Sequence, residues 1–209
     1  MRLLYTFLYA LGFVLLIFVH ECGHLLAARR LGLKVGAPVF IPFMGAFIAL
    51  KDAPPNAWIE AQVGIGGPLL GTLGAMVCYG LYLTTGTLLF AALAFSGFFL
   101  NLFNLAPVGF LDGGRVVTCL SPWLWLVGIF VVGFMLLRDL LQNDNLNVIL
   151  LLIFVTSLPR IFSLFRKKTE AERRYFEVTS EQRWLLAGLY FGLVIFLVLA
   201  MQVSHLTPE

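Results

Sequence analysis

Charged side chains are scarce in this sequence: only 12% of its 209 residues are Asp, Glu, Lys or Arg, while 60% are hydrophobic. A soluble domain carries about 25% charged residues, so this chain has too little charge to cover a water-facing surface. It also lacks a Pro-rich, Ser-rich or charged linker, which argues against a second, soluble domain. We therefore predict one membrane-embedded domain over residues 1–209.

A large net charge and an even set of cysteines are also missing. The net charge is only +3, and the basic residues lie between apolar segments, which argues against a nucleic-acid partner. The three cysteines, Cys22, Cys78 and Cys119, are odd in number and each lies in an apolar run. A disulfide framework is therefore not predicted.

Long uncharged runs, in contrast, are abundant. The longest, residues 61–111, exceeds twice the length of about 20 residues that a helix needs to cross a bilayer, so it must cross twice. The first run is longer than the apolar part of a cleavable signal peptide, and we expect it to remain as a span. The sequence predicts an all-α polytopic protein with about six transmembrane helices, at 3–28, 61–83, 88–111, 116–137, 146–164 and 184–203.

The basic residues set the predicted orientation. With the N-terminus outside, every Lys and Arg except Arg2 and Arg138 falls on the cytoplasmic side, as the positive-inside rule requires. The charged groups within the spans then lie near the cytoplasmic ends of the first and third helices. We expect an integral, multi-pass protein whose site faces the cytoplasmic side.

The first of these charged groups is His20-Glu21-Cys22-Gly23-His24. On a helix, residues four apart lie within about 40° of each other, so His20 and His24 can bind one metal ion from the same face. Glu21 lies about 100° from His20, beside the pair, where it can act on a water molecule without being a ligand. Ionisable groups inside a membrane are costly, so three within one turn indicate a functional site.

A catalytic zinc site usually has three protein ligands, so a third must come from another segment. His205 is in the tail on the opposite side in the predicted topology. Asp112, the first charged residue after the long apolar run, lies at a similar depth to the histidines and is the better candidate. An ordinary acidic residue in the Asp112-Gly113 turn is the alternative that the sequence leaves open.

Together, His20 to His24 and the segment Asn104-Leu105-Ala106-Pro107-Val108-Gly109-Phe110-Leu111-Asp112-Gly113 resemble the paired signature of the site-2 proteases, which are intramembrane zinc metalloproteases. The resemblance implies one Zn²⁺ per chain bound by His20, His24 and Asp112, with Glu21 as general base and Asn104 assisting near the scissile carbonyl. It covers a catalytic core at about 3–115, which leaves accessory helices at about 116–203.

The resemblance has one departure. Members of the family often carry a Gly-Pro-x-x-Asn segment in the intervening span, whereas here Gly67-Pro68-Leu69-Leu70-Gly71 ends in glycine. The chain also has no room for an inserted PDZ domain. The small size and the lack of appended domains lead us to expect a bacterial or archaeal cell membrane.

The segment 39–50 is apolar but is interrupted by Pro42 and Gly45, and it is too short to cross as a helix. We predict a membrane-associated β-hairpin or re-entrant loop whose free edge can pair with an extended substrate. A loop on the bilayer surface is the alternative.

The sequence thus predicts an intramembrane zinc endopeptidase that hydrolyses membrane-anchored or transmembrane protein substrates near the cytoplasmic side of the lipid bilayer, in regulated intramembrane proteolysis. The alternative is a zinc-binding membrane transporter or scaffold without protease activity. Transport should require polar groups distributed across the bilayer, whereas those of this sequence cluster on one side.

Overall fold

The computed structural model describes residues 2–41, 45–50, 53–109, 111–143 and 147–205. Five described helices, α1, α2, α5, α6 and α8, are long and apolar enough to cross a membrane, and α3 is a shorter apolar helix. The predicted all-α polytopic fold is confirmed. In chain order the elements are α1 (Arg2–Arg30), β1 (Val35–Ile41), β2 (Gly45–Leu50), α2 (Ala57–Thr85), α3 (Leu88–Asn104), α4 (Asp112–Leu120), α5 (Leu124–Asn143), α6 (Val148–Phe165), α7 (Glu170–Tyr175) and α8 (Ser180–His205).

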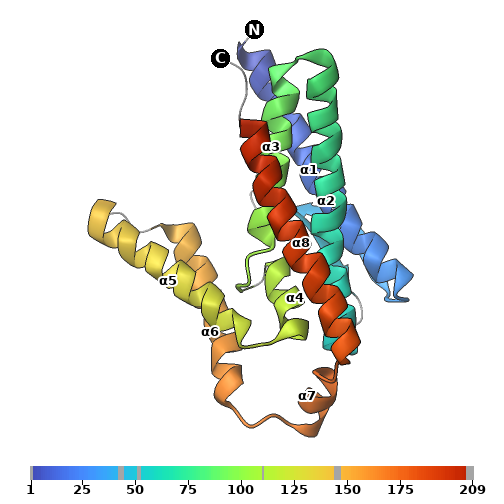
Figure 1. The fold of residues 1–209 in the computed structure, drawn as a ribbon, viewed down its shortest axis with the longest axis vertical. Coiled ribbons are helices and arrows are strands. Elements are labelled where there is room, and N and C mark those ends of the chain that lie inside the picture. The colour runs from blue at the N-terminus through green and yellow to red at the C-terminus, as the bar shows by residue number, and fades with distance from the viewer. Residues whose placement is uncertain (1, 42–44, 51–52, 110, 144–146, 206–209) are drawn as a thin grey trace.

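Helices α1, α2, α3 and α8 form the main bundle, with α2 packed against both α1 and α3 (Figure 1). Small residues allow the close approach: Ala61, Ala75 and Ala94 are fully buried, and a Cβ added to Gly97 would lie 2.8 Å from the Cβ of Ala75. Without a hydrophobic driving force between helices in lipid, such close packing is a main source of helix association. The start of α1 and the end of α8 lie at the same end of the bundle (Figure 1).

A two-stranded antiparallel hairpin follows α1. Strands β1 and β2 pair in the register Val39 to Phe47 and Ile41 to Gly45, and the hairpin packs against α1. Of the conformations considered for this segment, the structure therefore has the β-hairpin. Pro42, which interrupts this apolar segment, lies outside the described residues.

Two predicted helix boundaries are wrong. The third helix ends at Asn104, not at 111, because Pro107 has no amide hydrogen to continue it and Gly109 has a left-handed φ of 52°. The predicted helix 116–137 is divided into α4 and α5, and Pro122 lies in the break between them. Asp112 therefore begins a short helix of its own instead of ending the third span.

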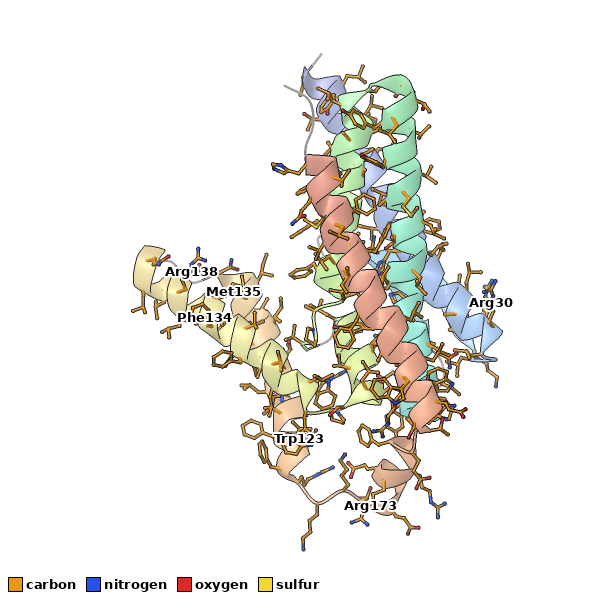
Figure 2. The ribbon with its side chains drawn as sticks, viewed as in Figure 1. Arg30, Trp123, Phe134, Met135, Arg138 and Arg173 are labelled. Atoms are coloured by element: carbon orange, nitrogen blue, oxygen red, sulfur yellow. The ribbon has the colours of Figure 1, made fainter. Side chains whose placement is uncertain are left out.

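Helix α5, which carries Phe134 and Met135, and helix α6 stand to one side of the main bundle (Figure 2). They pack on the segment between α3 and α4 through a small apolar cluster that includes Val108, Leu111 and Ile153. A Cβ added to Gly128 would clash with the carbonyl group of Pro107. Helices α5 and α6 thus support the segment that leads into Asp112.

The polar segment between α6 and α8 is attached to the start of α2. Thr169 and Glu172 form a capping box at the N-terminus of α7, and the Tyr175 hydroxyl donates a hydrogen bond of 2.5 Å to Glu60. Burial and this hydrogen bond raise the pKa of Tyr175 above its ordinary value, so the hydroxyl remains a donor at neutral pH.

A buried hydrogen bond joins α8 to the chain beyond α3. The Tyr190 hydroxyl donates to the carbonyl oxygen of Leu105 over 2.6 Å, and both residues are buried. We expect Tyr190→Phe to lower the free energy of unfolding by about 1–3 kcal/mol, because the carbonyl loses its partner. Unfolding in detergent, compared with Tyr5→Phe at an exposed position, measures the effect; equal stabilities would contradict the importance of this bond.

Candidate metal centre

His20 and His24 are adjacent on one face of α1, where this helix packs against α2. Their side chains are buried, with 3% and 8% of each residue exposed, and their rings meet edge to face with centroids 4.9 Å apart. The i, i+4 spacing predicted from the sequence therefore places both imidazoles in the protein interior. They do not face lipid.

Asp112 reaches the two histidines from α4. It is in the first turn of this helix, is buried, and lies on the α2 side, because a Cβ added to Gly64 of α2 would lie 3.3 Å from the Asp112 carbonyl oxygen. The alternative of an ordinary turn residue does not account for a buried carboxylate directed at two imidazoles. The structure brings together the three residues that the sequence analysis selected from two distant motifs.

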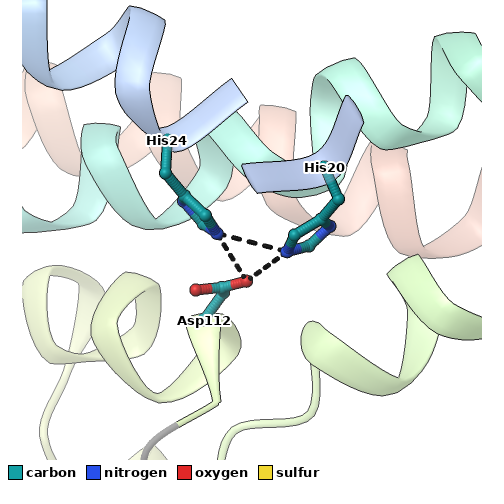
Figure 3. Close-up of side chains that lie close together, drawn as sticks. All are labelled: His20, His24 and Asp112. Atoms are coloured by element: carbon teal, nitrogen blue, oxygen red, sulfur yellow. Dashed lines mark hydrogen bonds and ion pairs between the residues drawn. The ribbon is translucent and has the colours of Figure 1, made fainter. Parts of the chain in front are cut away.

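The three side chains form a nearly equilateral triangle of ligand atoms (Figure 3). Asp112 Oδ2 lies 3.1 Å from His20 Nε2 and 3.2 Å from His24 Nε2, and the two Nε2 atoms are 3.2 Å apart. Among the described residues, this is the cluster of His, Cys, Asp and Glu side chains that could hold a metal ion.

The partners of the other ring nitrogens indicate that the two Nε2 atoms can bind a cation. His24 Nδ1 is 2.8 Å from the carbonyl oxygen of Val63, which can only accept, so Nδ1 donates and Nε2 of the neutral ring has a free electron pair. His20 Nδ1 lies 2.8 Å from Asn101 Oδ1, which likewise accepts. Three electron-pair donors therefore converge, and a divalent cation satisfies all three at once.

The triangle has dimensions that suit zinc. Tetrahedral Zn²⁺ with ligand bonds of about 2.0–2.1 Å separates neighbouring ligand atoms by about 3.3 Å, close to the distances between these three atoms. Two imidazoles and one carboxylate form a donor set that leaves a fourth position for a reacting molecule, as catalytic zinc sites require.

Glu21 and Asn104 differ in their relation to this centre. Glu21 is partly exposed and is close enough to His20, His24 and Asp112 to interact with them electrostatically. Asn104, in the last turn of α3, donates a hydrogen bond of 3.0 Å to the carbonyl oxygen of Leu100 in its own helix. Its assisting role remains a prediction.

The sequence analysis missed three contributors to the centre: Asn101, the carbonyl group of Val63, and Gly67. A Cβ added to Gly67 would lie 2.8 Å from His20 Nε2 and closer still to His24 Nε2, so only glycine leaves room for the ligands. The Gly-Pro pair was a signal for Gly67, but nothing in the sequence marked Asn101 or Val63, because their roles depend on how the helices face one another.

The structure also accounts for the departure at position 71. Gly71 is buried on α2, and a Cβ added there would clash with the side-chain amide of Asn101. The polar group beside His20 thus comes from α3, and Gly71 provides the space for it.

Comparison with known proteins agrees with this picture. Residues 8–89 match the family model described as Peptidase family M50. The chain is similar to the probable zinc metalloprotease EGY2, chloroplastic, of Oryza sativa subsp. indica (26% identical, covering 85% of this chain and 40% of that protein). It is also similar to the zinc metalloprotease MJ0392 of Methanocaldococcus jannaschii (30% identical, 52% and 34%) and the probable zinc metalloprotease EGY1, chloroplastic, of Arabidopsis thaliana (28% identical, 56% and 31%).

The fold defines the chain as a multi-pass membrane protein, and the comparisons show that it is similar to zinc metalloproteases. Its resemblance to the site-2 proteases, predicted from the two motifs, is confirmed by these matches. The chain spans 31–40% of the length of the three relatives described above.

Proposed function

We propose that this chain is an intramembrane zinc endopeptidase that hydrolyses peptide bonds of membrane-anchored or transmembrane proteins. One observation carries the proposal: His20, His24 and Asp112 direct three free electron pairs at one point, with ligand atoms 3.1–3.2 Å apart, and Glu21 lies beside them. The zinc metalloprotease names of the relatives support the same metal and the same reaction.

Each residue of the site would have a separate role in the reaction. His20, His24 and Asp112 would hold the zinc ion, which when bound activates water and polarises the scissile carbonyl. Glu21 would accept the proton of the attacking water and pass it to the leaving amine. Asn104, whose amide nitrogen donates to Leu100 of its own helix, would need to change rotamer to assist near the substrate carbonyl.

The same proposal assigns catalysis to the core at about 3–115, which contains all five of these residues, and an accessory role to 116–203. Packing of α5 and α6 on Val108 and Leu111, next to Asp112, supports this division. The accessory helices would hold the third ligand in place without contributing a ligand of their own.

A transmembrane substrate must unwind locally, since the peptide carbonyls of a helix are already hydrogen-bonded and shielded. The hairpin β1–β2 packs against α1, the helix that carries both histidines. We propose that an extended substrate segment pairs with an outer edge of this hairpin, which would replace the hydrogen bonds lost on unwinding. Cleavage near the cytoplasmic side follows from the proposed orientation, in which nearly all basic residues lie on that side.

Zinc transport is the second candidate, and the distribution of buried polar groups argues against it. Among the described residues, the buried acidic and basic side chains are His20, His24 and Asp112, all in one cluster. A transport path would be expected to place such groups at several depths. A scaffold without catalytic activity would not require an acidic side chain such as Glu21 beside the metal ligands.

The test combines metal analysis with cleavage. We expect purified protein to contain one zinc ion per chain, and to cleave membrane-anchored proteins in proteoliposomes into fragments whose new termini map near the cytoplasmic face. A chelator should abolish cleavage and added zinc should restore it. Zinc without cleavage across a broad substrate panel would favour transport or a scaffold, and protein that cannot bind zinc would overturn the site.

A further inference from the structure

We propose that Asn101 is a positioning residue that orients His20 for metal binding, in a space that it shares with position 71. This inference rests on the proposed function, since it concerns a ligand of the proposed zinc site. Asn101 lies on α3, 81 residues after His20 in the sequence, and it is 1% exposed.

Both ends of the Asn101 amide have a fixed partner. Its Nδ2 donates a hydrogen bond of 2.7 Å to the carbonyl oxygen of Gly97, one turn earlier on α3. A backbone carbonyl only accepts, so the amide cannot be turned over without placing two oxygens in contact. Oδ1 therefore faces His20 Nδ1, at 2.8 Å, and must accept.

This contact determines which nitrogen of His20 can bind a cation. With the hydrogen atom on Nδ1, the electron pair of the neutral ring is on Nε2, the atom 3.1 Å from Asp112 Oδ2. The bond also fixes the rotation of the ring. Hydrogen bonds of this kind to metal-binding histidines typically contribute 10- to 100-fold to metal affinity or activity.

Positions 71 and 101 compete for the same space. A Cβ added to Gly71 would lie 2.9 Å from both Cγ and Nδ2 of Asn101 and closer still to Oδ1. A side chain at 71 would thus displace the amide, whereas an amide attached at 71 could occupy its place if position 101 were small.

The first experiment measures zinc affinity in detergent by competition with a chromophoric chelator. We expect Asn101→Ala to bind zinc roughly 10- to 100-fold more weakly than wild type and to change the visible absorption spectrum of the Co²⁺-substituted protein. Gln202→Ala is the matched control: it removes an exposed amide side chain on α8, outside the metal centre, so it should leave zinc affinity and the Co²⁺ spectrum unchanged.

A purely structural role would lower the unfolding midpoint of metal-free Asn101→Ala but leave its zinc affinity and Co²⁺ spectrum as in wild type; that result would overturn the proposal. If wild-type protein itself binds no zinc, the proposed function fails instead. The two failures are thus distinguished by the wild-type measurement.

The second experiment exchanges the two positions. Gly71→Asn alone should weaken zinc binding, because it crowds Asn101. Gly71→Asn combined with Asn101→Ala should recover most of the affinity and the wild-type Co²⁺ spectrum. A double variant that binds zinc no better than Asn101→Ala would contradict the inference that an amide at position 71 can take the place of Asn101.

Discussion

Glu21→Gln is expected to lower peptide-bond cleavage by about 10²- to 10⁴-fold while zinc remains bound, since this is the usual contribution of a positioned general base. Glutamine keeps the size of the side chain but cannot accept the proton of the attacking water. Zinc should remain because Glu21 is not part of the triangle formed by His20, His24 and Asp112.

Cleavage rates on one membrane-anchored substrate, measured together with zinc content, test this expectation. Glu177→Gln is the matched control, since it makes the same chemical change at an exposed residue outside the site and should cleave as wild type does. If Glu21→Gln cleaves at the wild-type rate, another group must act as the base. If it loses zinc, Glu21 has a part in metal binding that the structure does not indicate.

Gly67→Ala is expected to reduce zinc affinity by about 10- to 100-fold, although it adds only one methyl group. The new Cβ would lie 2.8 Å from His20 Nε2 and closer to His24 Nε2, in the space that the ligands and the metal require. Overpacking of this kind costs about 1–3 kcal/mol in a protein core, and here the side chains that must move are the ligands themselves.

The control is Gly80→Ala on the same helix, where an added Cβ would meet no atom within 4 Å. Both variants gain the same intrinsic helix propensity, so any difference between them reports on the metal centre. Zinc titration of the two proteins measures it. Equal affinities would show that the α1–α2 contact can open enough to accept a methyl group, and that Gly67 is not required at the site.

Much of the site could be read from local sequence patterns. The spacing of His20 and His24 requires only that the segment be helical, and the length and composition of the run guarantee a helix in a membrane. The position of Asp112 after the long apolar run placed it near the depth of the histidines, although it begins α4 instead of ending the third span as predicted. Its role as third ligand remains a proposal for the zinc measurements to test.

The end of α3 was harder to predict. The run 88–111 is uniformly apolar, so hydropathy alone could not show that the helix stops at Asn104 and that the chain turns through Pro107 and Gly109 before α4. Proline was a visible signal, but membrane helices tolerate proline, as Pro68 within α2 demonstrates. Packing on α5 and α6 accompanies the turn here.

The amino-acid sequence by itself therefore determined the membrane class, most of the long helices, and the pair of motifs that hold the candidate ligands, because these depend on composition and on spacing within one helix. Only the tertiary structure decided which neutral groups surround the ligands. Asn101, Val63 and Gly67 act through the rotation and close approach of α1, α2 and α3, and contacts between helices leave no periodic signal in any one of them.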